Sequence, residues 1–247
     1  MKRLLTIAVS ASLCLCGRAG TEQYKAEAVK EYVHDTGAYT QGLFFHDGIL
    51  YESTGQFGES SLRTVDLSSG KVLRKLDFAR KYFCEGSVVL DGKIFLLTWL
   101  NKVAFVYDAV TLKYEKTCSY PREGWGLTTD GKELIASDGS SRLYFMDKEF
   151  RVTRTLPVRI EGRPALHLNE LEWIDGKIWA NVYTSNLIYI INPENGDVES
   201  VVDCSDLLPD RLRTSSTDVL NGIAVSGDGK IYVTGKYWPR IYEIKLK

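Results

Sequence analysis

The chain has 247 residues, of which 44% are apolar, and its formal net charge is −1. This length fits one large all-β domain or two smaller domains, and the apolar content is ordinary for a globular protein. A charge this close to zero argues against a nucleic acid as the main partner, because nucleic-acid-binding proteins usually present a basic face.

Residues 1–20 have the pattern of an export signal. A basic start precedes an apolar stretch at 4–15, which is too short to span a bilayer, and small residues follow it. Cys16 leaves two interpretations open: the cleaved signal of a periplasmic or secreted protein, or a lipoprotein box with a lipid anchor on Cys16. No later stretch is long enough for a membrane helix, so we expect a single folded domain at 21–247 without a membrane span.

Three cysteines lie beyond this leader, namely Cys84, Cys118 and Cys204. Their wide spacing contains no Cys-x-x-Cys pair and indicates neither a metal site nor a dense disulfide framework. One disulfide among them and three buried thiols both remain open. The three histidines are also scattered, without the spacing of metal ligands, so we expect no metal and no other cofactor.

A repeat organises the rest of the chain. Asp-Gly turns recur at Asp47, Asp91, Asp130, Asp175 and Asp228, at intervals of 44, 39, 45 and 53 residues. Each turn is flanked by short runs of strand-forming residues, which is a hairpin signal. A period of about 40–50 residues built of short strands is typical of a β-propeller, so we predict an all-β fold with five blades.

Each repeat supplies up to four strands in chain order. The first strand opens about six residues before the Asp-Gly turn and would line the central channel, and the second follows the turn. The outer strands mix charged and apolar residues, as edge strands do. We expect the second, third and fourth strands at 49–53, 63–66 and 71–76 in the first repeat, at 94–98, 104–108 and 114–118 in the second, at 133–137, 143–147 and 152–156 in the third, and at 178–182, 187–192 and 198–202 in the fourth.

The fifth repeat is one strand short, because only 231–235 and 239–246 follow its turn. The strand-like segment 24–33 precedes the first repeat and has no partner of its own. We expect it to supply the missing outer strand and so close the ring on the last blade. Only 205–213 has room for a short helix. A closed ring needs no partner, so we also expect a monomer.

Superposing the repeats brings two groups of residues to one rim of the channel. The first group precedes the first strands and comprises Gln41, Glu85, Trp125, Asn169 and Asn221. The second group lies eight residues after the turn aspartate and comprises Trp99, Asp138, Tyr183 and Lys236, with Thr54 in the shorter first repeat. Propeller channels are often polar and tryptophans often pack between blades. However, an acid, a lysine, amides and aromatics at equivalent positions suit a small polar pocket better than a core.

Two members of these groups have simpler interpretations. Asp138 lies in a Ser-Asp-Gly-Ser-Ser stretch and is expected mainly as a turn residue. Asn221 is expected to hold the backbone in place rather than to act on a substrate.

Several motifs point to a family. They are 39–43 (YTQGL), 83–86 (FCEG), 97–99 (LTW), 123–128 (EGWGLT), 168–172 (LNELE), 179–182 (WANV) and 220–224 (LNGIA). Together they resemble the plant and bacterial type of glutaminyl cyclase, also called glutamine cyclotransferase, over about residues 39–246. The resemblance implies a five-bladed propeller that converts the N-terminal glutamine of peptides or proteins to pyroglutamate, releases ammonia and uses no metal.

The resemblance also implies the residues of the site. Glu85 would be the acid/base, and the side chains lining the site would be Gln41, Phe83, Trp99, Trp125, Asn169 and Lys236. Two residues depart from the familiar pattern: Tyr39 stands where a phenylalanine is usual, and Tyr183 where a tryptophan is expected. We expect Tyr183 to change the width and polarity of the pocket without removing a catalytic group.

The chemistry of cyclisation suits these residue types. A proton must leave the attacking α-amine, the oxyanion must be stabilised, and the leaving nitrogen must gain a proton. Glu85 is the only acid of the first group and can do the first and third tasks in turn. Lys236 and Asn169 are donors suited to the oxyanion. Trp99 and Trp125 can donate from their indole N–H groups or enclose the aliphatic stem with their rings.

Two other functions remain open from the sequence. A calcium-dependent, lactonase-like hydrolase would want Glu85, Asn169, Asn221 and Asp138 around an ion, although Lys236 would then share the site with the cation. A non-catalytic propeller that binds peptides is the other.

Overall fold

The structure is a computed structural model and describes residues 20–247. The leader expected at 1–20, with Cys16, therefore lies outside the described residues except for Gly20, and it stays a prediction. Within 20–247, no helix is long and apolar enough to cross a bilayer.

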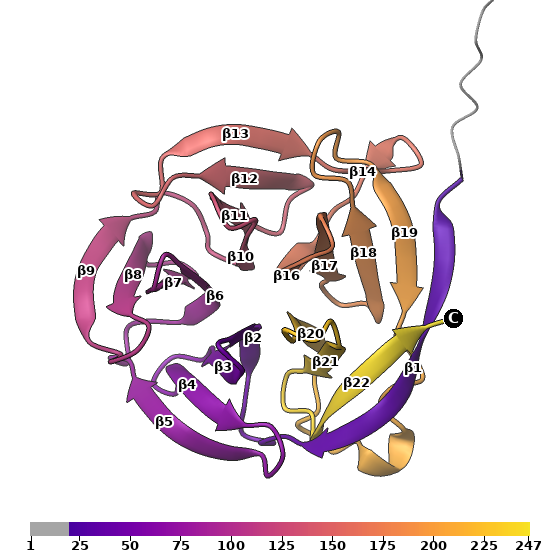
Figure 1. Cartoon of the computed structure of the whole chain (residues 1–247), viewed down its shortest axis with the longest axis horizontal. Coiled ribbons are helices and arrows are strands. Elements are labelled where there is room, and N and C mark those ends of the chain that lie inside the picture. Colours follow the sequence, from indigo (N-terminus) through magenta and orange to yellow (C-terminus); the bar gives the residue numbers. More distant parts are fainter. Residues whose placement is uncertain (1–19) are drawn as a thin grey trace, which may run out of the picture.

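The described chain is all-β and propeller-like, with sheets standing around a central axis (Figure 1). Three sheets have four strands each. They are β2–β5 (Thr40–His46, Ile49–Thr54, Ser61–Asp66, Lys71–Asp77), β6–β9 (Cys84–Leu90, Lys93–Thr98, Val103–Asp108, Tyr114–Ser119) and β10–β13 (Leu127–Thr129, Leu134–Ser137, Arg142–Met146, Val152–Pro157).

The remaining large sheet has eight strands in the order β16-β17-β18-β19-β1-β22-β21-β20. Its strands are β16–β19 (Leu168–Ile174, Lys177–Val182, Leu187–Ile191, Val198–Asp203), β20–β22 (Leu220–Val225, Ile231–Gly235, Arg240–Leu246) and β1 (Glu22–Val33). β1 pairs antiparallel with β22 from Ala26 onward, which confirms that the N-terminal strand completes the last group of strands. Its first residues also pair parallel with β19, a seam that the sequence analysis did not anticipate.

The Asp-Gly turns divide into two kinds. Asp47, Asp91 and Asp175 have φ of 49°, 50° and 48°, and each forms a two-residue loop with the glycine that follows. Asparagine, aspartate and glycine tolerate this left-handed backbone, which matches the twist of a hairpin. The turns at Asp130 and Asp228 are longer, because residues 130–133 separate β10 from β11 and residues 226–230 separate β20 from β21.

Two other expectations need correction. The helix expected within 205–213 is only a 3₁₀ turn, η1 (Asp210–Leu212), and it is the only helical element among the described residues. A short hairpin of β14 (Arg159–Ile160) and β15 (Arg163–Pro164) was not expected.

The three cysteines Cys84, Cys118 and Cys204 are free thiols, and Cys118 is only half-buried. There is thus no disulfide among them, and only two of the three thiols are buried, so neither interpretation from the sequence holds in full.

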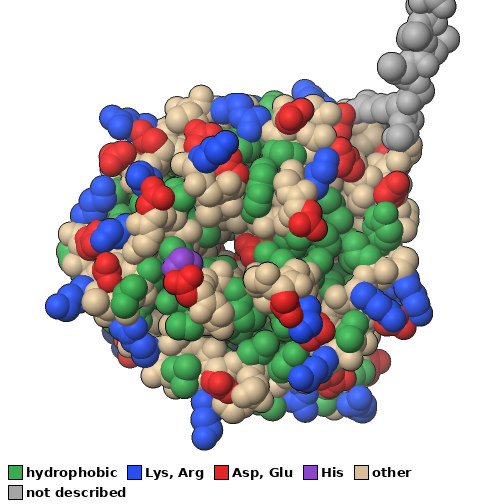
Figure 2. Space-filling view, in the orientation of Figure 1, with side chains coloured by type: hydrophobic (Ala, Val, Ile, Leu, Met, Phe, Trp, Pro, Cys, Tyr) green, Lys and Arg blue, Asp and Glu red, His purple; other side chains and the backbone are tan. Residues whose placement is uncertain are grey.

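The hydrophobic core lies between neighbouring sheets. In one cluster, Phe95 and Leu97 of the second sheet pack with Leu134 and Ala136 of the third, all of them buried. Each large apolar side chain removed from water contributes about 1.5–3 kcal/mol, so the sheets are stable as a ring and not singly. Figure 2 shows a hollow at the centre of the ring and a surface on which both signs of charge are mixed.

The inner strands approach one another closely around the axis, in the order β2, β6, β10, β16, β20 and back to β2. Glycine makes this approach sterically feasible. A Cβ on Gly86 would lie 2.4 Å from the backbone nitrogen of Leu127, and one on Gly126 would lie 2.0 Å from the backbone carbonyl oxygen of Asn169. The inner strand β16 carries Glu170 at the equivalent position.

We predict that Gly126→Ala lowers the free energy of unfolding by about 2–3 kcal/mol, because the new methyl group forces two inner strands apart. Gly227→Ala is the matched control, since a Cβ there meets nothing within 4 Å. Chemical denaturation of both variants measures the difference. Equal stability of the two would show that the inner strands are not in tight contact.

Candidate active site

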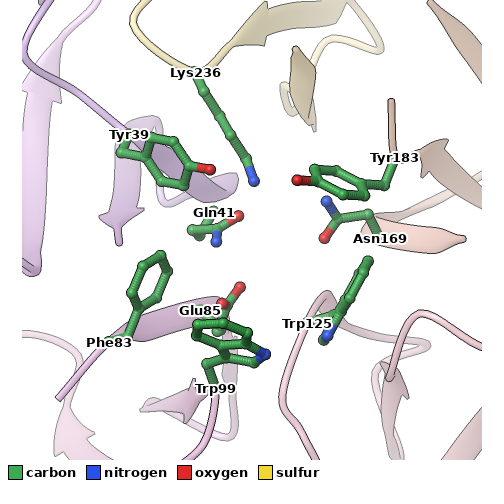
Figure 3. Close-up of a pocket in the computed structure, with 9 residues that line it drawn as sticks. All are labelled: Tyr39, Gln41, Phe83, Glu85, Trp99, Trp125, Asn169, Tyr183 and Lys236. Carbon is green, nitrogen blue, oxygen red and sulfur yellow. The ribbon is translucent and has the colours of Figure 1, made fainter. Parts of the chain in front are cut away.

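Nine side chains line a cavity of about 220 Å³ at one end of the central channel (Figure 3). They are Tyr39, Gln41, Phe83, Glu85, Trp99, Trp125, Asn169, Tyr183 and Lys236. The structure therefore brings together every residue that the sequence analysis assigned to the site. Tyr39 is the one lining residue that it missed, although Tyr39 begins the first of the motifs that carried the resemblance.

Most residues of the first group reach the pocket from β-bulges. The pairing of inner and second strands shifts register between Thr40 and Gly42, between Cys84 and Ser87, and between Leu168 and Leu171. Gln41, Glu85 and Asn169 occupy these irregular stretches. A bulge bends the strand and redirects a side chain, which explains why polar groups at these positions face the cavity rather than a neighbouring sheet.

The second group is held by a repeated backbone hydrogen bond. The N–H groups of Trp99, Tyr183 and Lys236 each donate to a carbonyl two residues before a first-group position, at 2.9–3.0 Å. In the first sheet the residue that makes this bond is Gly55, whose N–H donates to the Tyr39 carbonyl at 2.8 Å. The prediction that Thr54 occupies the equivalent position in the first sheet was therefore wrong by one residue, since Gly55 occupies it. The Phe83 ring lies only 2.3 Å from where a Cβ on Gly55 would be, and so fills that place.

Asp138, Asn221 and Thr54 do not line the cavity. The Asp138 carboxylate accepts hydrogen bonds from the backbone and hydroxyl of Ser140, as expected of a turn residue. The Asn221 amide donates to the Thr40 carbonyl at 2.9 Å and to Gln41 Oε1 at 3.2 Å. This second bond fixes the Gln41 amide, so that its NH₂ group is free to donate into the pocket.

Glu85 and Lys236 place opposite charges in a nearly dry site. They are 4% and 2% exposed, and Figure 3 shows them pointing from opposite sides toward the same central space. Burial raises the pKa of Glu85 well above its ordinary value, Lys236 opposes this shift, and Glu123 adds to it. Burial lowers the pKa of Lys236, against the carboxylates of Glu85 and Asp218. Burial thus disfavours the charged form of both groups and shifts their pKa values toward each other.

No described side chain within 20–247 hydrogen-bonds to the Glu85 carboxylate, the Lys236 ammonium or the Asn169 amide. Lys236 Nζ instead lies over the ring faces of Tyr39 and Tyr183, 4.5 and 5.2 Å from their centroids. Buried polar groups are normally paired within the protein. These three are directed at the cavity, which indicates that a ligand completes their bonding.

Aromatic rings form the walls. Phe83 packs edge-on against Tyr39 and Trp99, and Trp125 packs edge-on against Tyr183. Both indole N–H groups donate to Glu123 Oε2, from Trp99 at 2.9 Å and from Trp125 at 3.5 Å. They are therefore not free to act as donors to a ligand, contrary to one of the two roles proposed from the sequence, whereas their ring faces are available.

A buried ion network behind the pocket anchors its edge. The Glu52 carboxylate accepts hydrogen bonds from Nε and Nη2 of Arg63 at 2.9 and 2.8 Å and from the Thr40 hydroxyl at 2.7 Å, and it bonds to His34 Nε2 at 2.9 Å. Burial alone would raise the pKa of Glu52, but Arg63 and His34 hold it well below its ordinary value. His34 also bonds to the Trp238 carbonyl, so this network ties the segments that carry Gln41 and Lys236 together. His34 was among the histidines that the sequence did not assign.

Metal-ligand geometry is the last feature of the site. Over the described range 20–247, no group of three or more His, Cys, Asp or Glu side chains is placed to hold a metal ion.

The charges of the pocket make a prediction that needs no substrate. The pKa of Glu85 should lie above the usual range of glutamate and should rise further in Lys236→Met, because the opposing cation is lost. Carbon NMR of labelled glutamate side chains, titrated in both proteins, measures this. A Glu85 pKa near 4.5 in the wild type, or one that falls in Lys236→Met, would contradict the electrostatics described above.

Comparison with known proteins identifies the family. The family model described as glutamine cyclotransferase matches residues 3–246. A glutaminyl-peptide cyclotransferase of Arabidopsis thaliana is 44% identical over 229 residues, which are 90% of this chain and 71% of the relative. The crystal structure of glutaminyl cyclase from Myxococcus xanthus superposes with a TM-score of 0.86 at 34% identity, covering 92% of this chain and 98% of that one. The chain thus belongs to the glutamine cyclotransferase family.

Proposed function

We propose that the pocket cyclises the N-terminal glutamine of peptides or proteins to pyroglutamate with release of ammonia, and that Glu85 carries the proton. The family is that of glutaminyl-peptide cyclotransferases, and the observation that carries the mechanism is the Glu85 carboxyl. It is buried, it has no hydrogen-bond partner among the described side chains, and it shares a small cavity with Lys236 and Asn169.

The size and lining of the cavity suit one glutaminyl residue. Its volume of about 220 Å³ is below the roughly 300–1,000 Å³ of sites for drug-sized ligands. The ring faces of Trp99 and Trp125 can enclose the aliphatic stem, and the Gln41 NH₂ group can donate to a peptide carbonyl. Folding the flexible stem back toward its own amine supplies much of the acceleration, because the entropy lost in bringing the two reacting groups together is then lost on binding and not in the reaction step.

The reaction transfers one proton between two nitrogens of the substrate. An α-amine has a pKa of about 7.7–8, so a fraction is neutral at neutral pH. Its lone pair attacks the side-chain amide carbon, and the Glu85 carboxylate takes a proton from the attacking nitrogen as the new C–N bond forms. The oxyanion accepts hydrogen bonds from Lys236 and Asn169. Glu85 then protonates the amide nitrogen, the old C–N bond breaks, and ammonia leaves as the carbonyl re-forms.

The calcium-dependent alternative is not favoured. Of its four candidate ligands only Glu85 and Asn169 face the cavity, while Asp138 and Asn221 are used in a turn and in holding Gln41. Lys236 would also stand against the cation. A binding-only role explains less, since it gives no reason to bury an acid and a lysine without partners.

We propose that the fold has five blades. The eight-stranded sheet is then counted as two blades, β16–β19 and β20–β22 with β1, that share β1 as a seam. The change of β1 from parallel pairing with β19 to antiparallel pairing with β22 supports this division, as do the five Asp-Gly repeats of the sequence.

We propose in addition that the protein is exported, to the periplasm or beyond, and acts as a monomer. The leader pattern of 1–20 and the two alternatives for Cys16 support the first part. The pairing of β1 with both β19 and β22, which leaves neither of these strands as a free edge, supports the second.

Glu85→Gln tests the proposed reaction most simply. We expect it to lower kcat for ammonia release from a Gln-initiated peptide by about 10²–10⁴-fold, because an amide cannot shuttle the proton. Activity of the wild type should persist in a chelator. Near-normal turnover in Glu85→Gln would exclude this carboxyl as the acid/base. Ester hydrolysis that is lost in chelator, without ammonia release, would support the calcium-dependent alternative.

Asn221→Asp tests the role of the Gln41 amide. The carboxylate cannot donate to Gln41 Oε1, so the amide should turn its oxygen into the pocket and lose a bond to the substrate. We expect kcat/KM to fall about tenfold, the usual loss for one buried hydrogen bond. Thermal stability should fall as well, because the new carboxylate would be buried and would also lose the bond to the Thr40 carbonyl. A folded variant with unchanged kcat/KM would show that the orientation of Gln41 does not matter.

A further inference from the structure

Glu123 does not line the cavity, yet it bonds to two side chains that do. Its Oε2 accepts the indole N–H of Trp99 at 2.9 Å and that of Trp125 at 3.5 Å. The two indoles belong to different sheets, since Trp99 follows β7 and Trp125 precedes β10. A single carboxylate oxygen, with its two lone pairs, therefore ties together two rings that line the cavity.

The backbone around Glu123 is itself fixed. The Gly124 N–H donates to the Thr98 carbonyl at 3.1 Å, directly before Trp99. A Cβ on Gly124 would lie 2.6 Å from the Leu97 Cβ, so the segment is pressed against the end of β7. The backbone that carries Glu123 is therefore held in place, and the hydrogen bonds of its carboxylate hold the two indole rings in place as well.

Glu123 also carries an uncompensated charge close to the reaction. No Lys, Arg or His of the described chain forms an ion pair with it. The charged groups that act on Glu85 are Lys236, which lowers its pKa, and Glu123, which raises it together with burial. Position and charge of Glu123 are therefore two separable influences on the pocket.

We propose that Glu123 is a positioning residue for cyclisation, which holds the Trp99 and Trp125 rings against the glutaminyl stem so that the side chain stays folded toward its own amine. This inference rests on the proposed function. Misplacing a ring by about 1 Å weakens that geometry and can lower the rate by up to about 100-fold.

Two conservative variants separate position from charge. Glu123→Asp keeps the charge but is one methylene shorter and cannot reach both indoles, so kcat should fall about tenfold while the acid limb of the kcat/KM profile stays in place. Glu123→Gln keeps an acceptor oxygen, so kcat at its plateau should stay within about twofold. Loss of the charge lowers the pKa of Glu85, so its carboxylate form persists and the acid limb moves to lower pH.

Glu149→Gln is the matched control, because it removes the same charge from a carboxylate whose ion pairs are with Lys116 and Arg151 on the surface. It should change neither kcat nor the acid limb. Unchanged kcat in a folded Glu123→Asp, or a plateau kcat in Glu123→Gln that falls as far as in Glu123→Asp, would overturn the inference while Glu85→Gln remained inactive. An active Glu85→Gln would instead overturn the proposed function, whatever the Glu123 variants do.

Discussion

The close approach of the inner strands is the constraint on which the site depends. Glycine lets β6 lie against β10 and β10 against β16. Glu170 on β16 joins the adjacent strand β20 and the non-adjacent strand β2, since its two oxygens accept the N–H groups of Ile223 on β20 at 2.9 Å and Leu43 on β2 at 3.2 Å. These contacts draw the bulged strand ends of several sheets to one point. A cavity of about 220 Å³ therefore collects side chains from positions almost 200 residues apart in the chain.

The scaffold must compensate for what the pocket contains. An unpaired buried charge costs several kcal/mol, and Glu85 and Lys236 are both buried without a hydrogen-bond partner among the described side chains. The apolar core between the sheets offsets this cost. In return, desolvation shifts the pKa values of the acid and the lysine toward each other, which is the condition under which one carboxyl can both accept and donate a proton.

Most of the residues that line the pocket could be predicted from the sequence, because the repeat places each of them at a fixed spacing from an Asp-Gly turn. The turn at Asp91 and the residues Glu85 and Trp99 on either side of it follow from spacing alone, and the same spacing finds Asn169, Tyr183 and Lys236. Features that depend on contacts between sheets could not be predicted. The Glu123 bonds to both indoles, the Glu170 bond to Leu43 on the non-adjacent strand β2 and the parallel pairing of β1 with β19 join segments that no periodicity relates. The position equivalent to Trp99 in the first sheet is Gly55 and not, as predicted, Thr54. A glycine is required there because the Phe83 ring, which belongs to another sheet, fills the space that a side chain would occupy.

In the proposed mechanism one carboxyl, that of Glu85, serves both substrate nitrogens. A crystal structure of Glu85→Gln with a bound Gln-initiated peptide tests this directly, because the inactive variant keeps the substrate intact. We expect the side chain at position 85 to lie within hydrogen-bond reach, about 2.6–3.2 Å, of both the α-amine and the side-chain amide nitrogen. A complex in which another acid, or no acid, lies between those two nitrogens would contradict it.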